Sequence, residues 1–135
     1  MKNISTLTHD LEQLWQKGSS PDPELLKVFC DNVSDAITSS FTEAVSKEKR
    51  TVLRMSSLGK PSRQLWYESR DSTEPEQLDY STRLKFLYGH MIEELLVLLV
   101  KMAGHSVEDQ QEEHDIDGVK GHQDARVDGV LVDFK

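Results

Sequence analysis

The hydrophobic positions of this chain follow two different periods, and the change comes near Gly104. Before Gly104, apolar residues recur every three or four positions, as on one face of an amphipathic helix. After Gly104 they alternate with polar residues, as in a strand with one buried face. The order of these patterns predicts an α+β fold in which the helices come first. We expect helices over 7–17, 23–45 and 81–103, a short strand over 51–55, a turn or short helix over 57–68, a polar loop over 71–79, and strands over 110–116, 119–127 and 130–135.

The segment 81–103 carries the strongest helical pattern. Ser81 can cap its start, and Gly104 can end it in a left-handed conformation. Its second half is apolar nearly all round, which is typical of a helix that is buried on more than one side. Glu93 lies in an apolar row of this helix, where a carboxylate is costly unless a cation compensates it. A nearby cation and a snorkelling or Lys-paired Glu93 are the two alternatives.

Two Asp-Gly pairs, Asp117-Gly118 and Asp128-Gly129, divide the strand region. An Asp-Gly pair between extended segments is a strong hairpin signal, because a tight two-residue turn needs positive φ at both positions. We therefore predict that the helix is followed by a three-stranded antiparallel meander.

Strand alternation assigns the side chains of the last two strands to faces. Val130, Val132 and Phe134 are expected on the core face, so Asp133 and Lys135 point the other way. Asp124 lies on the corresponding face of the neighbouring strand, and the sequence therefore predicts that Asp124 and Asp133 converge. Two carboxylates beside a lysine suit a hard divalent cation such as Mg²⁺ and a water that attacks a phosphate.

Composition and charge adjust this picture. The 135 residues suit one domain, and the net charge of −8 argues at first against a nucleic-acid partner. The charge is uneven, however: 46–70 holds seven Lys or Arg against two Glu, and 108–135 holds nine acids against three bases. The basic segment could bind phosphates and the acidic segment could bind cations. The alternative is that both segments are solvent-exposed surfaces without such a role.

Cysteine usage and hydropathy indicate the compartment. Cys30 is the single cysteine, so it forms no internal disulfide or CxxC metal site, and a cytoplasmic location is expected. Its helical context predicts a buried thiol. No stretch resembles a signal peptide or a membrane span, so no membrane partner is expected.

The residues that could carry chemistry resemble the PD-(D/E)XK nucleases, in particular the RecB-type and phage lambda-type exonuclease branch. The helix sequence GHMIE ending at Glu93 is similar to the first motif of this branch, GHQD ending at Asp124 to the second, and DFK from Asp133 to Lys135 to the third. The segment RMSSLGKPSRQLWYE over 54–68 resembles a further upstream motif. The resemblance covers about 54–135, and it depends on the order and spacing of the motifs together.

The resemblance implies a restriction-endonuclease-like core and a role for each matched residue. It implies that Asp124 and Asp133 bind Mg²⁺ or Mn²⁺ and that Glu93 does so directly or through water. It also implies that the backbone carbonyl of Phe134 is a further ligand and that Lys135 acts on the nucleophilic water. The division that follows is an N-terminal helical region, 1–50, and a partial nuclease core, 51–135.

The chain departs from the pattern of this family in two ways. Some relatives carry cysteines for an iron–sulfur cluster, and a chain with Cys30 alone is expected to have none. Relatives also continue past the third motif with a helix, often marked Q-x-x-x-Y, and a further strand. We therefore expect this chain to be a fragment that lacks the terminal helix and strand of the core.

Several other residues are weaker candidates. Arg54, Ser56 and Ser57 could bind a DNA phosphate, and a surface Arg with a Ser helix cap is the alternative. Trp66 and Tyr67 could stack on a base but are more often core residues in such a pattern. His90 and His122 flank the expected site and could be ligands, and the alternative is that they are neighbours of the site or exposed residues.

Together these observations favour a metal-dependent deoxyribonuclease, and within that class an exonuclease of phage or bacterial DNA recombination and processing. A non-catalytic DNA-binding or assembly module of the same fold, and an endonuclease, are the alternatives. DNA is the expected partner, and a second copy of the chain or a recombination protein would be a further one. The location would be the host cytoplasm if a phage encodes the chain.

Overall fold

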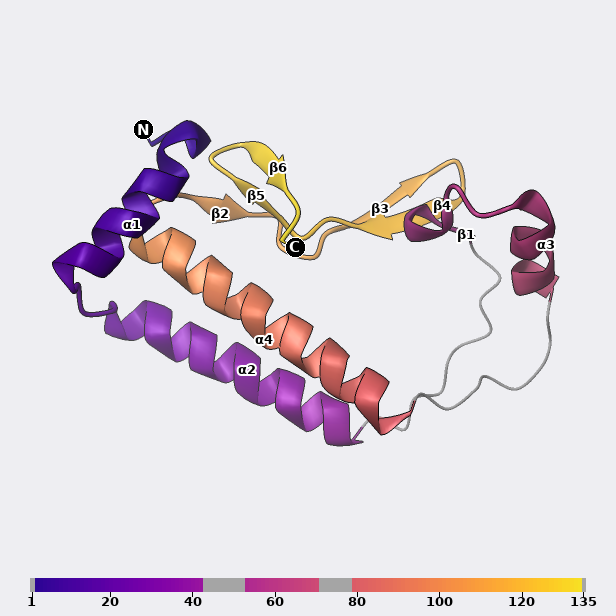
Figure 1. The fold of residues 1–135 in the computed structure, drawn as a ribbon, viewed down its shortest axis with the longest axis horizontal. Coiled ribbons are helices and arrows are strands. Elements are labelled where there is room, and N and C mark those ends of the chain that lie inside the picture. The colour runs from indigo at the N-terminus through magenta and orange to yellow at the C-terminus, as the bar shows by residue number, and fades with distance from the viewer. Residues whose placement is uncertain (1, 43–52, 71–78, 135) are drawn as a thin grey trace.

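The computed structural model describes residues 2–42, 53–70 and 79–134. It confirms the predicted mixture of helices and strands, with two small three-stranded sheets. The two longest helices lie side by side and antiparallel, and the first α-helix crosses one end of this pair (Figure 1). The helices are α1 (Leu7–Lys17), α2 (Pro23–Thr42), α3 (Ser62–Arg70) and α4 (Tyr80–Met102), with 3₁₀ turns η1 (Ile4–Thr6) and η2 (Met55–Ser57). The strands are β1 (Leu53–Arg54), β2 (Val107–Glu108), β3 (Glu113–Ile116), β4 (Val119–His122), β5 (Ala125–Val127) and β6 (Val130–Val132).

The pairing of α2 with α4 decides which side of α2 is buried. The partly buried positions of α2 recur at helical spacing and form the stripe that meets α4. Cys30 is one position out of phase with Phe29, which belongs to that stripe, so its thiol is exposed. The prediction of a buried Cys30 was therefore wrong.

One end of α4 is capped by a residue other than the predicted one, and the other end stops at the predicted glycine. The N-cap is Asp79 rather than Ser81: the Thr82 N–H donates to Asp79 Oδ1 at 3.1 Å, and the Ser81 hydroxyl donates to Asp79 Oδ2 at 2.8 Å. At the other end, Gly104 has a φ of 84°, the left-handed conformation expected for it.

The core lies where the second half of α4 meets the sheet of β2, β5 and β6. Ala125 and Val127 of β5 are both 0% exposed. On β6, however, Val130 is 46% exposed, so its predicted place in the core was wrong. The buried apolar side chains of the described residues are Val97, Leu98, Val100, Ala103, Ala125 and Val127.

In the part of the chain that the structure describes, no helix is long and apolar enough to cross a membrane.

The predicted three-stranded meander was wrong, because its middle strand is interrupted. Gln123 and Asp124 leave the strand pattern, so the expected strand 119–127 becomes β4 and β5, which belong to different sheets. Each hairpin instead gains its third strand from elsewhere in the chain: β1 pairs parallel with β4, and β2 pairs antiparallel with β5. The physical reason is that the backbone and side chain of Gln123 bond to the β2–β3 connection, as described below.

Both predicted Asp-Gly hairpins are present. Asp117 and Gly118 have φ values of 52° and 81°, and Asp128 and Gly129 have values of 49° and 81°. Positive φ at both central residues is the conformation of a type I′ turn. The flanking registers pair Ile116 with Val119 and Val127 with Val130, as two-residue loops require.

Gly121 allows η2 to approach β4 closely. A Cβ at this position would lie 2.6 Å from Met55 Sδ and 2.9 Å from Met55 Cγ. Glycine, which has no Cβ, therefore fits at this position, and a larger residue would require Met55 to shift.

We predict that Gly121→Ala lowers the free energy of unfolding by about 1–3 kcal/mol, the usual cost of overpacking. The loss should shrink when Met55→Ala is present, because the clashing atoms are then gone. Urea denaturation of the two single variants and the double variant measures this coupling. Equal losses in both backgrounds would show that Met55 is not the cause.

Trp66 and Tyr67 of α3 were expected in the core, and this prediction was wrong. Their residues are 50% and 53% exposed. The rings contact each other and two arginines of the same helix.

Candidate functional site

Gln111 joins Glu93 to Asp124. Glu93 is partly buried on α4, and its Oε1 accepts a hydrogen bond from Gln111 Nε2 at 2.5 Å. The backbone N–H of Gln111 donates to the carbonyl oxygen of Asp124 at 3.1 Å. Gln111 lies in the connection between β2 and β3 and has a φ of 53°, an uncommon conformation for this residue type. One residue therefore connects the helix motif to the second motif.

Asp124 also meets the third motif. The backbone N–H of Phe134 donates to Asp124 Oδ2 at 2.8 Å. The β5–β6 ladder ends at the pair Ala125 and Val132, so Asp124 and Asp133 are the residues just beyond it on the two chain segments. The predicted neighbour Lys135 lies outside the described residues.

Gln123 fixes the backbone just before Asp124. It is 9% exposed, and its Nε2 donates to the Asp109 carbonyl oxygen at 2.9 Å. Its Oε1 lies 2.9 Å from His114 Nε2, and its backbone N–H donates to the Glu112 carbonyl oxygen at 3.2 Å. These bonds replace the sheet ladder and turn the chain between β4 and β5.

Sequence reasoning missed both glutamines. For Gln123 a signal existed: the alternation that buries Ala125 and Val127 puts Gln123 on the same face, and a buried amide must be hydrogen-bonded. For Gln111 no periodicity marks a role, because its contacts are to residues far away in the sequence.

The oxygen donors at this place suit a hard cation, although they are few. Across 2–42, 53–70 and 79–134, no three His, Cys, Asp or Glu side chains gather as a metal-binding group. Mg²⁺ is commonly held by only one or two carboxylates, with water and substrate phosphate as its other ligands. A pair of carboxylates is thus within the range of donor sets that Mg²⁺ accepts.

The candidate phosphate-binding residues lie on the other sheet. Arg54 of β1 pairs with Lys120 of β4, and η2, which carries Ser56 and Ser57, packs on β4. The structure therefore places all three beside the strand that leads to Asp124. His122, at the end of that strand, has its Nε2 3.6 Å from a carboxylate oxygen of Glu113 and is exposed.

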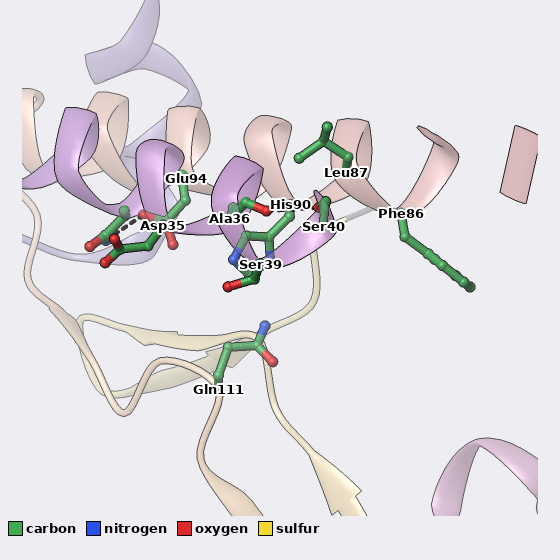
Figure 2. Close-up of a pocket in the computed structure, with 10 residues that line it drawn as sticks. Asp35, Ala36, Ser39, Ser40, Phe86, Leu87, His90, Glu94 and Gln111 are labelled. Atoms are coloured by element: carbon green, nitrogen blue, oxygen red, sulfur yellow. Dashed lines mark hydrogen bonds between the residues drawn. The ribbon is translucent and has the colours of Figure 1, made fainter. Parts of the chain in front are cut away.

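An open groove of about 560 Å³ runs between α2 and α4. Figure 2 shows His90 and Glu94 of α4 facing Ser39 and Asp35 of α2, with Gln111 approaching from the strand side. Inside the groove Asn32 Nδ2 donates to Glu94 Oε2 at 2.8 Å, which joins the two helices. Because Gln111 lines the groove and binds Glu93, the groove opens beside the candidate site.

A second polar cluster, missed by the sequence analysis, lies at the turn between β5 and β6. The side chain of His105 is 0% exposed, and its two ring nitrogens face two carboxylates. Nδ1 lies 2.5 Å from Asp128 Oδ2, and Nε2 lies 3.1 Å from Asp10 Oδ2. The cluster therefore joins α1, the end of α4 and the β5–β6 turn.

The carboxylates of this cluster are held in their ionised form. The hydrogen bond from His105, helped by the N–H and hydroxyl of Ser106, keeps the pKa of Asp128 below its usual value of 3.8. The pKa of Asp10 is lowered as well, first by the Thr6 hydroxyl and then by Lys2. Both shifts stabilise the charged network around the buried ring.

The candidate site thus consists of residues from three separate segments. Glu93 comes from α4, Asp124 from the connection of β4 to β5, and Phe134 from the segment after β6. Their contacts run through Gln111 and through a backbone amide. The chain matches no protein-family model, no curated protein and no solved structure.

Proposed function

We propose that this chain is a metal-dependent deoxyribonuclease of the PD-(D/E)XK superfamily, in the RecB-type and phage lambda-type exonuclease branch. Its residues from about Arg54 onward would form part of a restriction-endonuclease-like core. The observation that carries the proposal is the contact of the Asp124 carboxylate with the Phe134 amide, next to Asp133, at 2.8 Å. Glu93 reaches the same place through Gln111.

Mg²⁺, or Mn²⁺ in its place, is the cofactor that these donors fit. Asp124 and Asp133 would supply two carboxylates and Phe134 its carbonyl, with Glu93 bound directly or through water. When bound, the cation acidifies a water and neutralises charge on the scissile phosphate. An iron–sulfur cluster is not proposed, because the chain has one cysteine.

The residues of the chain would orient these groups. Phe134 N–H fixes one oxygen of Asp124, and Gln111 fixes one oxygen of Glu93, so the carboxylates have fewer orientations to lose when a cation binds. Lys135 would orient the attacking water and stabilise the developing negative charge. Arg54, Ser56 and Ser57 would hold a phosphate of the DNA strand.

The test is cleavage of linear and circular duplex DNA of the same sequence with Mg²⁺, Mn²⁺ or a chelator. We expect cleavage of the linear form with either metal and none with chelator, because the reaction needs the cation. Degradation of linear DNA alone supports an exonuclease, since a circle has no end. Equal cutting of both forms would make the protein an endonuclease, and cutting that survives chelation would reject the metal mechanism.

A non-catalytic DNA-binding module of the same fold is the second candidate. The observation that favours it is that Glu93 Oε1 and Asp124 Oδ2 already accept hydrogen bonds within the chain. Binding of DNA without cleavage under every metal in the same assay would decide for this module.

A further inference from the structure

The helix α3 exposes two aromatic rings that touch each other. The centroids of Trp66 and Tyr67 are 5.0 Å apart, and the ring planes are 88° apart, an edge-to-face pair. Both residues are about half exposed, at 50% and 53%. Such a pair leaves a large apolar area in contact with water.

Two arginines cover part of these rings. Arg70 Cζ lies 4.7 Å from the Trp66 ring centroid, and Arg63 Cζ lies 5.9 Å from the Tyr67 centroid. Each pair is spaced four residues apart, so the cation and the ring are neighbours on the helix surface. Arg63 and Arg70 are themselves exposed. The four side chains therefore form one surface that is both aromatic and cationic, called here the α3 platform.

The charge of this region is opposite to that of the chain. Residues 53–70 hold four Lys or Arg and one acidic residue, whereas the whole chain has a net charge of −8. Arg54, across the η2 turn from α3, adds a further exposed cation. A local positive surface on an acidic protein attracts polyanions while the rest of the molecule repels them.

We propose that the α3 platform binds single-stranded nucleic acid, with bases stacked on Trp66 and Tyr67 and phosphates held by Arg63 and Arg70. Exposed aromatic faces bind bases only where these are unstacked, and guanidinium groups beside them bind the backbone. A duplex hides its bases, so the platform favours a single strand or a frayed end. The inference rests on the proposed nuclease function for one point, that the nucleic acid is DNA.

The test measures binding in chelator, where no cleavage is expected. A fluorescein-labelled oligodeoxythymidine is titrated with the full chain, and its anisotropy gives the affinity. We expect Trp66→Ala to weaken binding by about tenfold or more, the usual effect of one lost stacking contact. Trp15→Ala is the matched control, because Trp15 is 74% exposed on α1 and outside the platform.

Three further variants separate stacking from folding and from charge. Trp66→Phe should retain most of the affinity and Trp66→Leu should not, because leucine keeps apolar bulk but has no π face. Replacing Arg63 with Gln should reduce the salt dependence of log K by roughly 0.7, the value for one phosphate contact of a single strand. Circular dichroism shows whether each variant is folded.

The inference fails if Trp66→Ala and Trp15→Ala bind alike, if Phe and Leu at position 66 are equivalent, or if poly-glutamate displaces the strand as readily as unlabelled oligonucleotide. Equal binding of a hairpin duplex would also overturn it. These outcomes are separate from the nuclease test: a chain that cuts no DNA can still bind the strand through Trp66, and a chain that cuts DNA can bind without it.

Discussion

Replacing Asp124 with Asn in the chain is expected to lower Mg²⁺-dependent DNA cleavage by about a thousandfold, and Asp133→Asn should do the same. The site has few anionic groups, so the loss of one charge removes much of the affinity for the cation. Asn is preferred to Ala at position 124 because its amide oxygen can still accept the bond from the Phe134 N–H. The measurement is the initial rate of cleavage of linear duplex DNA.

The control for this result is Asp117→Asn, in the turn of the other hairpin. It should cut at the rate of the unchanged protein. Lys135→Ala should impair cleavage while leaving Mg²⁺ affinity close to normal, because a lysine is no metal ligand. If Asp133→Asn cuts normally, the metal mechanism is wrong.

Replacing His105 with Ala is expected to lower the Tm by about 10 °C or more, a larger loss of stability than that expected for Gly121→Ala. The substitution removes a fully buried ring and leaves the carboxylates of Asp10 and Asp128 facing a cavity in place of the ring that both contact. Thermal unfolding followed by circular dichroism measures the change. His9→Ala, at an exposed position of α1, is the matched control and should leave Tm unchanged.

Acid should weaken the same network. Because the pKa of Asp128 is lower in the folded than in the unfolded protein, its contribution to stability is complete above the ordinary value of 3.8. It is lost as the pH falls below 3.8 through the lower folded pKa. The urea midpoint of the unchanged protein should therefore drop in this range, and Asp128→Asn should drop less steeply. A parallel decline of both proteins would show that Asp128 does not control it.

Local patterns predicted most elements correctly. The helical period gave α1, α2 and α4, and the Asp-Gly pairs gave both hairpins, because these signals act over a few neighbouring residues. The break at Gln123 was missed because its side chain bonds to Asp109, 14 residues away, in place of a sheet ladder. Cys30 was misplaced because an apolar sequence context does not specify which phase of α2 meets α4.

In the candidate site, too, only the relations between residues close in the sequence could be predicted. The two-residue turn determines locally that Asp124 and Asp133 follow the last ladder pair of β5 and β6, and the convergence of their side chains stays a prediction. Gln111, which joins Glu93 to Asp124, depends on the path of the β2–β3 connection in three dimensions. His105 has partners 23 and 95 residues away, and no spacing rule links such positions.

The bond between Asp10 and His105 also has a consequence for how a newly made chain folds. At synthesis rates of about 5–20 residues per second, the 95 residues between them take roughly 5–20 s to be made. During this interval α1 has neither His105 nor Asp128 to hold it, and a helix of 11 residues is marginal by itself. The helix α1 is made before its partners and is thus among the last of these elements to dock, and until it docks it is a segment that chaperones and proteases can reach.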